Sequence, residues 1–450
     1  MARQLFGTDG VRGRAGEFLT AELALSLARA AVALGSAGDP GAAGAHPQVL
    51  IVRDTRESGE MLEAAIAAGV TAAGGDALLA GVLPTPAAPL LIRRHGLSLA
   101  AVISASHNPY ADNGIKLFAS DGFKLADDDE HRIEAELERP PAPSQRIGRV
   151  RALDGALEDY LTELQARFAD LDLSGRRVLL DCANGATYRA APEIFRRLGA
   201  DVEVLADAPD GRNINDDCGS THLQQLISVM GKGKHDVAFG FDGDGDRVLA
   251  VDRSGGVVDG DELVALAAVH LRDVGRLRGG GVAVTVMTNY GFHTAMREAG
   301  IEVATTAVGD RYVLDELRRR GWTLGGEQSG HIIELGFGPS GDGIASALLT
   351  LEALGDRDLA ARDTMHKLPQ RLVNIRGEDR AALAAAMEAD AVQAAIALAD
   401  QQLSGRGRVL VRASGTEPLI RVMVEAPTEE ETDLRCGELA RVIESVLDGR

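Results

Sequence analysis

The chain has 450 residues, which is too many for one typical hydrophobic core, so two to four domains are expected. Its apolar fraction of 45% and charged fraction of 25% are those of ordinary globular proteins. Asp and Glu outnumber Lys and Arg by 67 to 47, giving a formal charge of -20. This charge disfavours nonspecific binding to DNA or RNA, which needs a basic surface, but a local cluster of Arg and Lys can still hold a small anion.

The cysteines and the hydropathy pattern indicate the cellular setting. The three cysteines are far apart, odd in number and form no CxxC pair, which is typical of a reduced compartment. The first residues contain no apolar signal region, and no run of about 18 apolar residues occurs. We therefore expect a soluble cytoplasmic protein that binds neither nucleic acid nor a membrane.

Short apolar runs alternate with helical patterns along most of the chain. A strand predicted at 49–52 precedes a helix at 59–69, and a strand at 99–104 precedes a serine-containing turn. The same alternation predicts further strands at 178–180, 202–205, 237–240, 282–286 and 303–305. Continuous apolar strands separated by helices indicate parallel sheets that are covered on both faces.

The last part of the chain has a different pattern. It predicts one Ala-rich helix over 380–402, two strands at 409–412 and 419–425 around a turn, and a terminal helix over 428–447. The Gly-, Ala- and Pro-rich stretch 35–47 is interpreted as a surface insertion. A proline cluster at 140–144, a turn at 254–256 and the interval 366–370 mark breaks between domains. Domain boundaries are therefore expected near these breaks.

Three aspartates at alternate positions follow the buried strand 237–241. Asp242, Asp244 and Asp246 are separated by glycines, which permit backbone angles that let the three carboxylates converge. Converging carboxylates repel one another unless a cation neutralises them, and hard oxygen donors suit Mg²⁺. The loop has no glutamate at the twelfth position of an EF-hand, and a turn of solvated acids is the remaining alternative. Arg247, which follows, fits a site that also holds phosphate oxygens.

A serine lies in a turn of small residues at 103–109. Ser106 is followed by His107, and Lys116 lies ten residues further on. An exposed serine near basic groups can accept or donate a group, although a turn serine without a chemical role remains an alternative. If Ser106 carried a phosphate, one phosphate oxygen could occupy a vacant position on the metal, which would withdraw charge from the phosphoryl group.

Two more loops carry polar groups. Residues 412–418 place hydroxyls and a glycine between two strands, which makes an anion nest, and Arg412 and Arg421 can offer paired N–H donors to a phosphate. A simple hairpin turn is the alternative. Residues 325–331 bring a carboxylate, a hydroxyl and an imidazole onto a glycine-rich loop, which suits recognition of sugar hydroxyls, although a structural loop is also possible. Residues 309–311 give a weaker signal that fits a helix cap equally well.

Together these motifs resemble those of the α-D-phosphohexomutases. The segments 6–13, 54–56, 104–109, 242–247, 325–331 and 412–418 occur in the family's order, and the resemblance covers residues 3–445. Residues 213–215 and 218–222 are similar to the branch that acts on glucosamine phosphates. The resemblance implies an α/β fold with four domains in a heart shape. Three would be α/β domains with mixed sheets, and the fourth a smaller C-terminal α+β domain that binds phosphate.

The resemblance also implies a role for each matching residue. Ser106 is the phosphoserine, and it binds one Mg²⁺ per subunit together with Asp242, Asp244 and Asp246. Catalytic roles fall to Arg12, His107, Lys116, Arg247 and His331, with Lys116 as general acid or base helped by His331. The substrate would be bound by Glu327, Ser329, Gly309, Asp310 and Arg311, and its non-reacting phosphate by Arg412, Ser414, Gly415, Thr416 and Arg421. One departure from the family pattern is Val52, which replaces a common glycine.

The implied reaction is interconversion of glucosamine 6-phosphate and glucosamine 1-phosphate. It would pass through the phosphoserine and a 1,6-bisphosphate of glucosamine or glucose, which also serves as activator, and would feed the synthesis of UDP-N-acetylglucosamine and the cell wall. The partners expected are a hexosamine phosphate and, by analogy with relatives, a second copy of the chain. The alternatives are a mutase for glucose or mannose phosphates and a noncatalytic sugar-phosphate sensor. The opening motif and Gln328 favour glucosamine.

Overall fold

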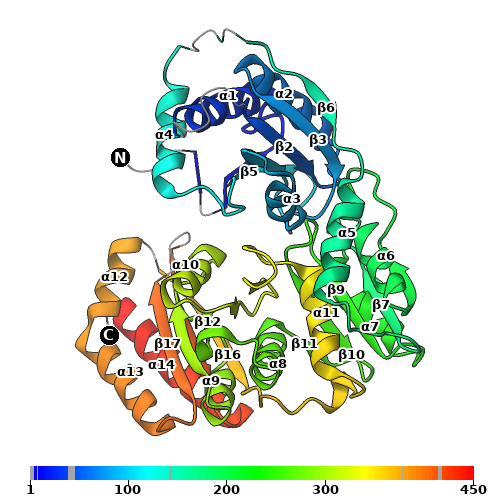
Figure 1. Ribbon diagram of the computed structural model, residues 1–450. Coiled ribbons are helices and arrows are strands. Elements are labelled where there is room, and N and C mark those ends of the chain that lie inside the picture. Colours follow the sequence, from blue (N-terminus) through cyan, green and yellow to red (C-terminus); the bar gives the residue numbers. More distant parts are fainter. Residues whose placement is uncertain are drawn as a thin grey trace. The chain divides into compact units, whose positions relative to one another are not determined.

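The computed structural model describes residues 5–7, 9–38, 46–140, 144, 146–377, 379–413 and 418–449. The chain divides into two compact units. The first contains Met1–Met287 and Glu302–Arg362, and the second contains Thr288–Ile301 and Asp363–Arg450. The ribbon follows the chain from blue at the N-terminus to red at the C-terminus (Figure 1). Among the described residues, three sheets belong to the first unit and one to the second.

The first sheet has the strand order β1-β5-β4-β2-β3-β6. The central strands are parallel, whereas β5 runs antiparallel to both β4 and β1. The predicted strands at 49–52 and 99–104 are confirmed as β2 and β4, but the pattern missed β5. The bounds are β1 Val11–Arg14, β2 Gln48–Arg53, β3 Asp76–Val82, β4 Leu99–Ile103, β5 Asp112–Ala119 and β6 Val150–Ala152.

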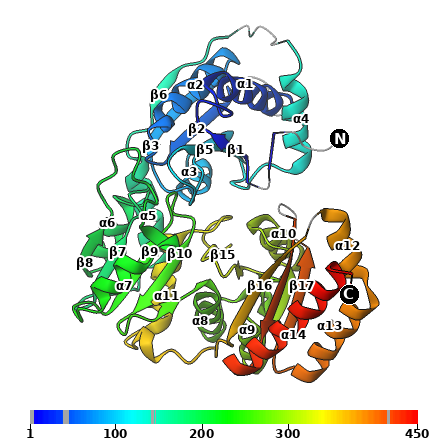
Figure 2. The same cartoon turned by 180° about the vertical axis from the view of Figure 1, so that it is seen from behind.

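Alternate side chains of β2 divide the core of this first domain. Val49 and Ile51 pack with α1 (Ala21–Gly38), α2 (Ser58–Ala72) and α4 (Asp127–Leu137) in one hydrophobic cluster. Leu50 and Val52 are fully buried but lie outside that cluster, because successive side chains of a strand point to opposite faces. Figures 1 and 2 show α1 and α2 on one side of the sheet and α3 (Ala87–His95) on the other.

The second and third sheets repeat this plan. Their strand orders are β11-β10-β9-β7-β8 and β13-β12-β14-β15. Parallel strands again form the centre, while β10 runs antiparallel to β9 and β15 runs antiparallel to β14. The bounds are β7 Arg177–Asp181, β8 Asp201–Leu205, β9 Val237–Phe241, β10 Val248–Asp252, β11 Val257–Val258, β12 Gly281–Thr285, β13 Glu302–Thr306, β14 Leu324–Gly326 and β15 Ile332–Glu334.

The mixed sheets confirm the fold class, and the strands predicted from apolar runs pair in parallel as expected, while antiparallel strands are added beside them. Antiparallel neighbours can be joined by short connections, whereas parallel neighbours need a crossover. The short connection from β9 to β10 carries the three aspartates, and the one from β14 to β15 carries residues 327–331. Both sequence motifs therefore lie at the tips of hairpins.

The remaining elements of the first unit are helices that cover these two sheets. Their bounds are α5 Ala156–Arg167, α6 Ala190–Arg197, η2 Gly219–Thr221, α7 Gln224–Met230, α8 Gly260–Asp273, η3 Arg278–Gly280, α10 Asp310–Arg320, α11 Gly343–Leu354 and η4 Leu359–Ala361. The start of α8 illustrates the local sequence logic. Asp259 accepts from the backbone of Asp261 and Glu262, and the Glu262 side chain accepts from the Asp259 backbone, which forms a capping box.

The described part of the second unit contains an antiparallel sheet with the order β16-β18-β17 and four helices. The bounds are α9 Tyr290–Glu298, β16 Gln370–Arg376, α12 Arg380–Glu388, α13 Asp390–Leu403, β17 Arg408–Ala413, β18 Leu419–Glu425 and α14 Glu429–Leu447. The two strands and the terminal helix predicted here are confirmed. Within this sheet Glu425 is fully buried and pairs with Arg408 at 2.8 Å.

The Ala-rich segment is two helices and not the single predicted one. Ala389 has an extended backbone between α12 and α13, and the helices bend there by 58°. The bend lets Leu383 on α12 and Leu403 on α13 enter the same hydrophobic cluster, which a straight helix cannot do. In the described part of the chain no single helix is long and apolar enough to cross a membrane. The bent pair passes that test jointly, by length and composition alone.

Val52 keeps a strand backbone at the position where the family commonly has glycine. It is fully buried in β2 and is opposite Val102 of β4. On the other side the pairing with β3 shifts by one residue between Ile51 and Val52. The shift in register affects only the pairing with β3, while β2 pairs regularly with β4 as far as Arg53. Asp54 therefore follows directly after a regular strand end.

Asp342 at the start of α11 offers a pH-dependent test of stability. It is buried, accepts from the Ala345 backbone at 2.9 Å and from the Tyr160 hydroxyl at 2.9 Å, and burial raises its pKa to about 6. Because this folded pKa exceeds the unfolded value of about 3.9, the stability gained from protonating Asp342 is complete below about pH 4 and is lost as the pH rises through 6.

We therefore expect Asp342→Asn, which stays neutral and keeps an oxygen for the helix cap, to gain stability relative to the native chain as the pH rises. The gain between pH 4 and pH 7 should be on the order of 1–3 kcal/mol. Urea unfolding of both proteins across this range measures it. A difference independent of pH contradicts the expectation.

Candidate active site

The three aspartates of the hairpin loop between β9 and β10 converge as the sequence predicts. Asp242, Asp244 and Asp246 are all buried, and each offers a carboxylate oxygen within 4.8 Å of the others. One oxygen of Asp244 and one of Asp246 are buried without a hydrogen-bond partner in the described part of the chain. Buried polar atoms are normally paired, so these oxygens mark a place for a ligand. Three converging carboxylates, two of which have an oxygen without a hydrogen bond, fit Mg²⁺.

Within the trio, the pKa values of Asp242 and Asp246 are shifted in opposite directions. Burial, followed by the charges of Asp246 and Asp244, raises the pKa of Asp242 well above its ordinary value. Burial opposes ionisation of Asp246 as well, but His331 and Lys116 hold its pKa well below the ordinary value. A divalent cation would relieve the repulsion.

The two glycines of the loop are needed for different reasons. Gly245 has φ +73°, a left-handed backbone that glycine adopts without strain. Gly243 has no such angle, but a Cβ there would lie 2.7 Å from the carbonyl oxygen of Ser106. The predicted conformational role therefore holds for Gly245, whereas Gly243 is required for close approach of the serine loop.

Ser106 lies beside this carboxylate cluster. Its hydroxyl donates to Asp242 Oδ2 at 2.6 Å, and His107 Nδ1 lies 3.3 Å from the same hydroxyl. Ser106 is 1% exposed, so the expectation of an exposed serine is wrong. Its φ is +52°, an uncommon conformation for a residue with a Cβ. The serine thus has a strained backbone next to the proposed metal position, and strained residues of this kind concentrate at functional sites.

Residues 54–56, which follow β2, form hydrogen bonds that hold the serine turn in place. Asp54 accepts from the Ser104 hydroxyl at 2.6 Å, and the same hydroxyl accepts from the Ser106 backbone at 2.9 Å. Arg56 is fully buried and pairs with Asp54 at 2.9 Å. Its guanidinium also donates to the carbonyls of Ser106, at 2.9 Å, and Asn108, at 2.8 Å. The motif at 54–56 is therefore a support for the serine turn.

Lys116 on β5 reaches into the carboxylate cluster. Its ammonium donates to Asp244 Oδ2 at 2.9 Å and lies 3.1 Å from Asp9 and 3.7 Å from Asp246. Burial alone would lower the pKa of Lys116, but Asp244 and Asp9 raise it far above the ordinary value. A lysine held protonated in this way suits the role of proton or hydrogen-bond donor better than that of base.

A ring of alternating charges connects Lys116 to His331. Asp9 contacts Lys116, Lys124 contacts both Asp9 and Asp310, and Asp310 lies 3.7 Å from His331. Against the effect of burial, Lys116 and Lys124 lower the pKa of Asp9 well below its ordinary value. Arg12 also pairs with Asp9. Lys116 and His331, the two residues predicted to transfer protons, are therefore connected by one network of charged side chains.

His331 has a defined arrangement within that ring. The Gly341 N–H donates to Nε2 at 3.1 Å, which leaves the proton of a neutral ring on Nδ1, 3.6 Å from Asp246. Burial would lower the pKa of His331, while Asp246 raises it, and the net direction is upward. For His107 burial and then Arg247 lower the pKa, so the two histidines are shifted in opposite directions.

The hairpin between β14 and β15 borders a cavity of about 370 Å³. Glu327, Ser329 and His331 line it together with Arg12 and Arg247. Asp246, Gly309 and Asp310 also contribute to its wall. The structure therefore brings most of the predicted site residues of the first unit to one hollow.

Gln328 and Arg311 each have polar contacts with residues outside the predicted site. Gln328 lines the cavity, but its side-chain N–H donates to Asp259 at 3.1 Å, and a glucosamine-specific contact by Gln328 stays a prediction. Arg311 donates to the Leu125 carbonyl at 2.9 Å and pairs with Asp127. Its guanidinium therefore faces the 125–127 segment, and a direct substrate contact by Arg311 stays a prediction.

The predicted phosphate clamp lies in the second unit. Arg412 and Arg421 are opposite each other in the antiparallel pair β17–β18, so their side chains lie on the same face of that sheet. Ser414, Gly415 and Thr416, which connect these strands, lie outside the described residues. The clamp as a whole stays a prediction.

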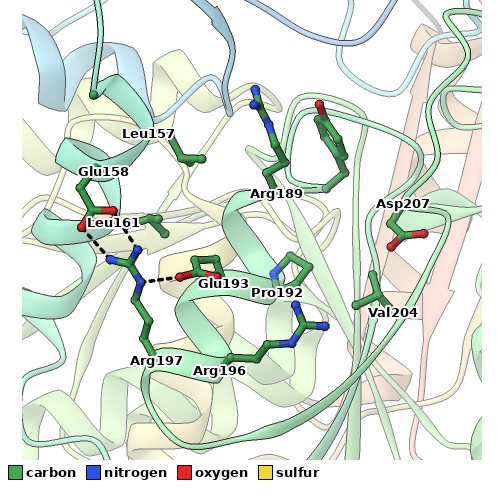
Figure 3. Close-up of a pocket in the computed structure, with 12 residues that line it drawn as sticks. Leu157, Glu158, Leu161, Arg189, Pro192, Glu193, Arg196, Arg197, Val204 and Asp207 are labelled. Atoms are coloured by element: carbon green, nitrogen blue, oxygen red, sulfur yellow. Dashed lines mark hydrogen bonds and ion pairs between the residues drawn. The ribbon is translucent and has the colours of Figure 1, made fainter.

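A different cavity, of about 510 Å³, lies between α5 and α6 and contains none of the predicted site residues. Figure 3 shows Arg197 joined to Glu158 and Glu193, and both partners accept from it at 2.8 Å. Asp207 lies across the hollow from these pairs. The acids balance the arginines here, so this surface shows no excess of positive charge for binding a phosphate.

Sequence reasoning missed several members of the site. Lys124 and Thr85 had no motif to mark them, yet Lys124 completes the charge ring and the Thr85 hydroxyl donates to Asp244 at 2.7 Å. Asp9 belongs to the segment 6–13, but the sequence alone assigns it no role. Only its position between three cations, which depends on the fold, reveals its function in the ring.

Comparison with known proteins identifies the class to which this fold and site belong. Four family models for phosphoglucomutase/phosphomannomutase match in order: domain I at residues 3–143, domain II at 158–256, domain III at 259–372 and the C-terminal domain at 372–442. A phosphoglucomutase/phosphomannomutase family protein from Burkholderia thailandensis has a TM-score of 0.81 at 23% identity, with 98% of this chain and 97% of that chain covered. The class defined is the phosphohexomutases.

The relatives specify the branch. A phosphoglucosamine mutase from Moorella thermoacetica is 49% identical over 451 residues, covering 98% of this chain and 99% of the relative. The chain therefore belongs to the phosphoglucosamine mutases, which are isomerases. An N-acetylphosphoglucosamine mutase from Aspergillus fumigatus, solved in complex with GlcNAc-6P and magnesium, has the same fold, with a TM-score of 0.65 at 20% identity over 99% of this chain and 96% of that chain.

Proposed function

We propose that the protein interconverts glucosamine 6-phosphate and glucosamine 1-phosphate, with Ser106 as the residue that stores the phosphoryl group. The observation that carries this proposal is the Ser106 hydroxyl, 2.6 Å from one member of a buried carboxylate trio with unpaired oxygens. The phosphorylated serine would donate its phosphoryl group to the free hydroxyl of the sugar phosphate. The resulting 1,6-bisphosphate would turn around and return its other phosphate to Ser106.

Mg²⁺ fits the carboxylate trio and would be held by Asp242, Asp244, Asp246 and an oxygen of the phosphoserine. When bound it would withdraw charge from the phosphoryl group. The protein's own cations serve the same end. Lys116 is kept protonated by its acidic neighbours, and Arg247 and Arg12 line the cavity next to Asp246. These groups can neutralise and orient the phosphoryl oxygens while the wall of the cavity limits access of water.

Sugar hydroxyls would contact Glu327 and Ser329 at the tip of their hairpin. Glu327 already accepts from the Gly309 N–H at 3.1 Å, which orients the carboxylate toward the cavity that both residues line. A carboxylate and a hydroxyl two residues apart can accept from and donate to neighbouring sugar hydroxyls. This arrangement suits a substrate that must bind in two orientations.

A three-substrate assay tests the proposed function. Turnover is measured on glucosamine, glucose and mannose phosphates, and the mass of the intact protein is recorded before and after addition of glucose 1,6-bisphosphate. We expect the highest kcat/KM on glucosamine phosphates and a mass increase of one phosphoryl group on Ser106. Preference for glucose or mannose phosphates would assign a different mutase activity, and a protein that is never phosphorylated would indicate a noncatalytic sensor.

Arg421→Ala tests the proposed phosphate clamp. A guanidinium that binds the non-reacting phosphate contributes equally to the substrate and the transition state, so its loss should raise KM by on the order of 10-fold or more with little change in kcat. Steady-state kinetics with glucosamine 6-phosphate measures both constants. A large fall in kcat at saturating substrate would instead show that Arg421 also stabilises the transition state.

The remaining expectations follow from the same proposal. The bisphosphate would act as intermediate and activator, the protein would work in the cytoplasm and supply UDP-N-acetylglucosamine for cell-wall synthesis, and two copies of the chain would form the working assembly. The boundaries after residues 153, 255 and 367 are proposed as the limits of the four domains. Limited proteolysis and sedimentation test the last two points directly.

A further inference from the structure

The loop between β8 and η2 reaches the serine turn from the second domain. Asn215 in this loop is 8% exposed, and its side-chain amide donates to the carbonyl of Ser106 at 2.9 Å and to that of Asn108 at 3.1 Å. Arg56 of the first domain donates to the same two carbonyls. The backbone at the nucleophile is therefore held by two side chains from two different domains of the first unit.

The place where these side chains meet is tightly packed. A Cβ on Gly243 would lie 2.6 Å from the Asn215 amide nitrogen and 2.7 Å from the Ser106 carbonyl oxygen. Asn215 thus lies at the junction of the serine turn and the metal loop. Its own backbone is left-handed, with φ +57°, and is fixed by donation from its N–H to the Ala183 carbonyl at 2.9 Å.

A reciprocal contact links the same two domains. Thr85 of the first domain donates its hydroxyl to Asp244 at 2.7 Å, and its backbone N–H donates to the Asp244 carbonyl at 2.8 Å. The first domain therefore holds the metal loop of the second, while Asn215 of the second holds the serine turn of the first. Thr85 touches a carboxylate of the trio, whereas the described side-chain hydrogen bonds of Asn215 go only to carbonyls of the serine turn, so Asn215 can be changed without altering the trio directly.

We propose that Asn215 is a positioning residue that fixes the strained backbone of Ser106 against the metal loop and thereby sets the rate of phosphoryl transfer. This inference rests on the proposed role of Ser106 as the phosphoryl carrier. A residue with positive φ persists only when its surroundings hold it. Losing one of the two supports lets the serine hydroxyl move away from the in-line geometry. A displacement of about 1 Å at a reacting atom can cost on the order of 10²-fold in rate.

The test uses Asn215→Gly with Asn184→Gly as its matched control. Asn184 is also left-handed, with φ +47°, and its side-chain amide donates to the Asn213 carbonyl within its own domain and not to the serine turn. Glycine accepts both backbones, so each variant loses one amide side chain and gains similar chain flexibility. The phosphoryl group is supplied as glucose 1,6-bisphosphate to dephosphorylated protein, and the mass shift at Ser106 is followed with time.

We expect Asn215→Gly to slow phosphorylation of Ser106 and to lower kcat by about 10- to 100-fold, with KM changed by less than about 3-fold. Asn184→Gly should lose a similar amount of thermal stability and keep near-native kcat. Equal kcat values in the two variants overturn the inference. If the native protein itself takes no phosphoryl group, the proposed function fails instead, so the two failures are distinguishable.

Asn215→Asp keeps the test decisive if the glycine variant does not fold. Aspartate has the same size and tolerates the left-handed backbone, but in its ionised form it cannot donate to the two carbonyls. We expect it to lose at least as much kcat as the glycine variant while unfolding cooperatively. Native kcat in Asn215→Asp overturns the inference.

Discussion

Ser106→Ala is expected to abolish mutase activity, with kcat reduced by on the order of 10⁴-fold or more. The variant keeps the fold and the carboxylate trio but removes the oxygen that donates to Asp242 and would carry the phosphoryl group. Substrate can still bind in the cavity lined by Glu327 and His331, because those residues come from a different hairpin. The measurement is turnover of glucosamine 6-phosphate, together with the intact mass after exposure to the bisphosphate.

Ser346→Ala serves as the control for this variant. Ser346 is a buried serine in α11 whose side chain takes no part in the proposed site. The Ser346→Ala variant should take up a phosphoryl group at Ser106 and turn over substrate at the native rate. Near-native turnover in Ser106→Ala would exclude a covalent carrier at this position.

Asp244→Asn is expected to lower kcat by on the order of 10²-fold or more, if electrostatic stabilisation here behaves as in other active sites. The change removes a charge from the oxygens that fit Mg²⁺ and from the partner of Lys116. Removal of divalent ions by a chelator should inactivate the native protein, and added Mg²⁺ should restore it. Activity is measured against Mg²⁺ concentration for both proteins, and the variant should need more Mg²⁺ for half of its maximal rate.

Asp252→Asn is the matched control, since Asp252 is a buried aspartate at the opposite end of β10. It pairs with Arg362 at 2.8 Å and accepts from Ser254, so its loss should lower the stability of the fold. Its dependence on Mg²⁺ should stay native. The assignment of the metal loop is contradicted if both aspartate variants respond alike or if the chelated native protein remains active.

Much of the fold and of the chemistry could be predicted because it lies in local patterns. The aspartates at 242, 244 and 246 needed only their spacing and the buried strand before them, and strands such as 237–240 needed only continuous apolar residues. The antiparallel strand β5 was missed because Asn113, Gly114 and Lys116 interrupt its apolar residues, although all three are buried in the structure. Lys116 is buried only because the fold supplies Asp9 and Asp244 as partners.

Contacts between distant segments could not be predicted from the sequence either, because the fold determines which residues meet. Lys124 pairs with Asp310, which is 186 positions away, and Asn215 binds the carbonyl of Ser106 across 109 positions. The local sequence does not distinguish Lys124 from a surface lysine, and the resemblance at residues 213–215 does not reveal which residue Asn215 contacts. The break at Ala389 was missed because alanine favours helix on both sides of it, and only the shared core explains the bend.

The hairpin that carries Glu327 and Ser329 is tied at both ends. Its strands pair from Gly326 to Ile332, and His331 forms a β-bridge with Arg247 at the end of the metal loop. A change of length that shifted the register of these strands would turn their side chains to the opposite face of the sheet. Relatives or engineered forms that accept other hexoses should therefore differ by one-for-one exchanges at positions 327–330, while the length of this connection stays constant.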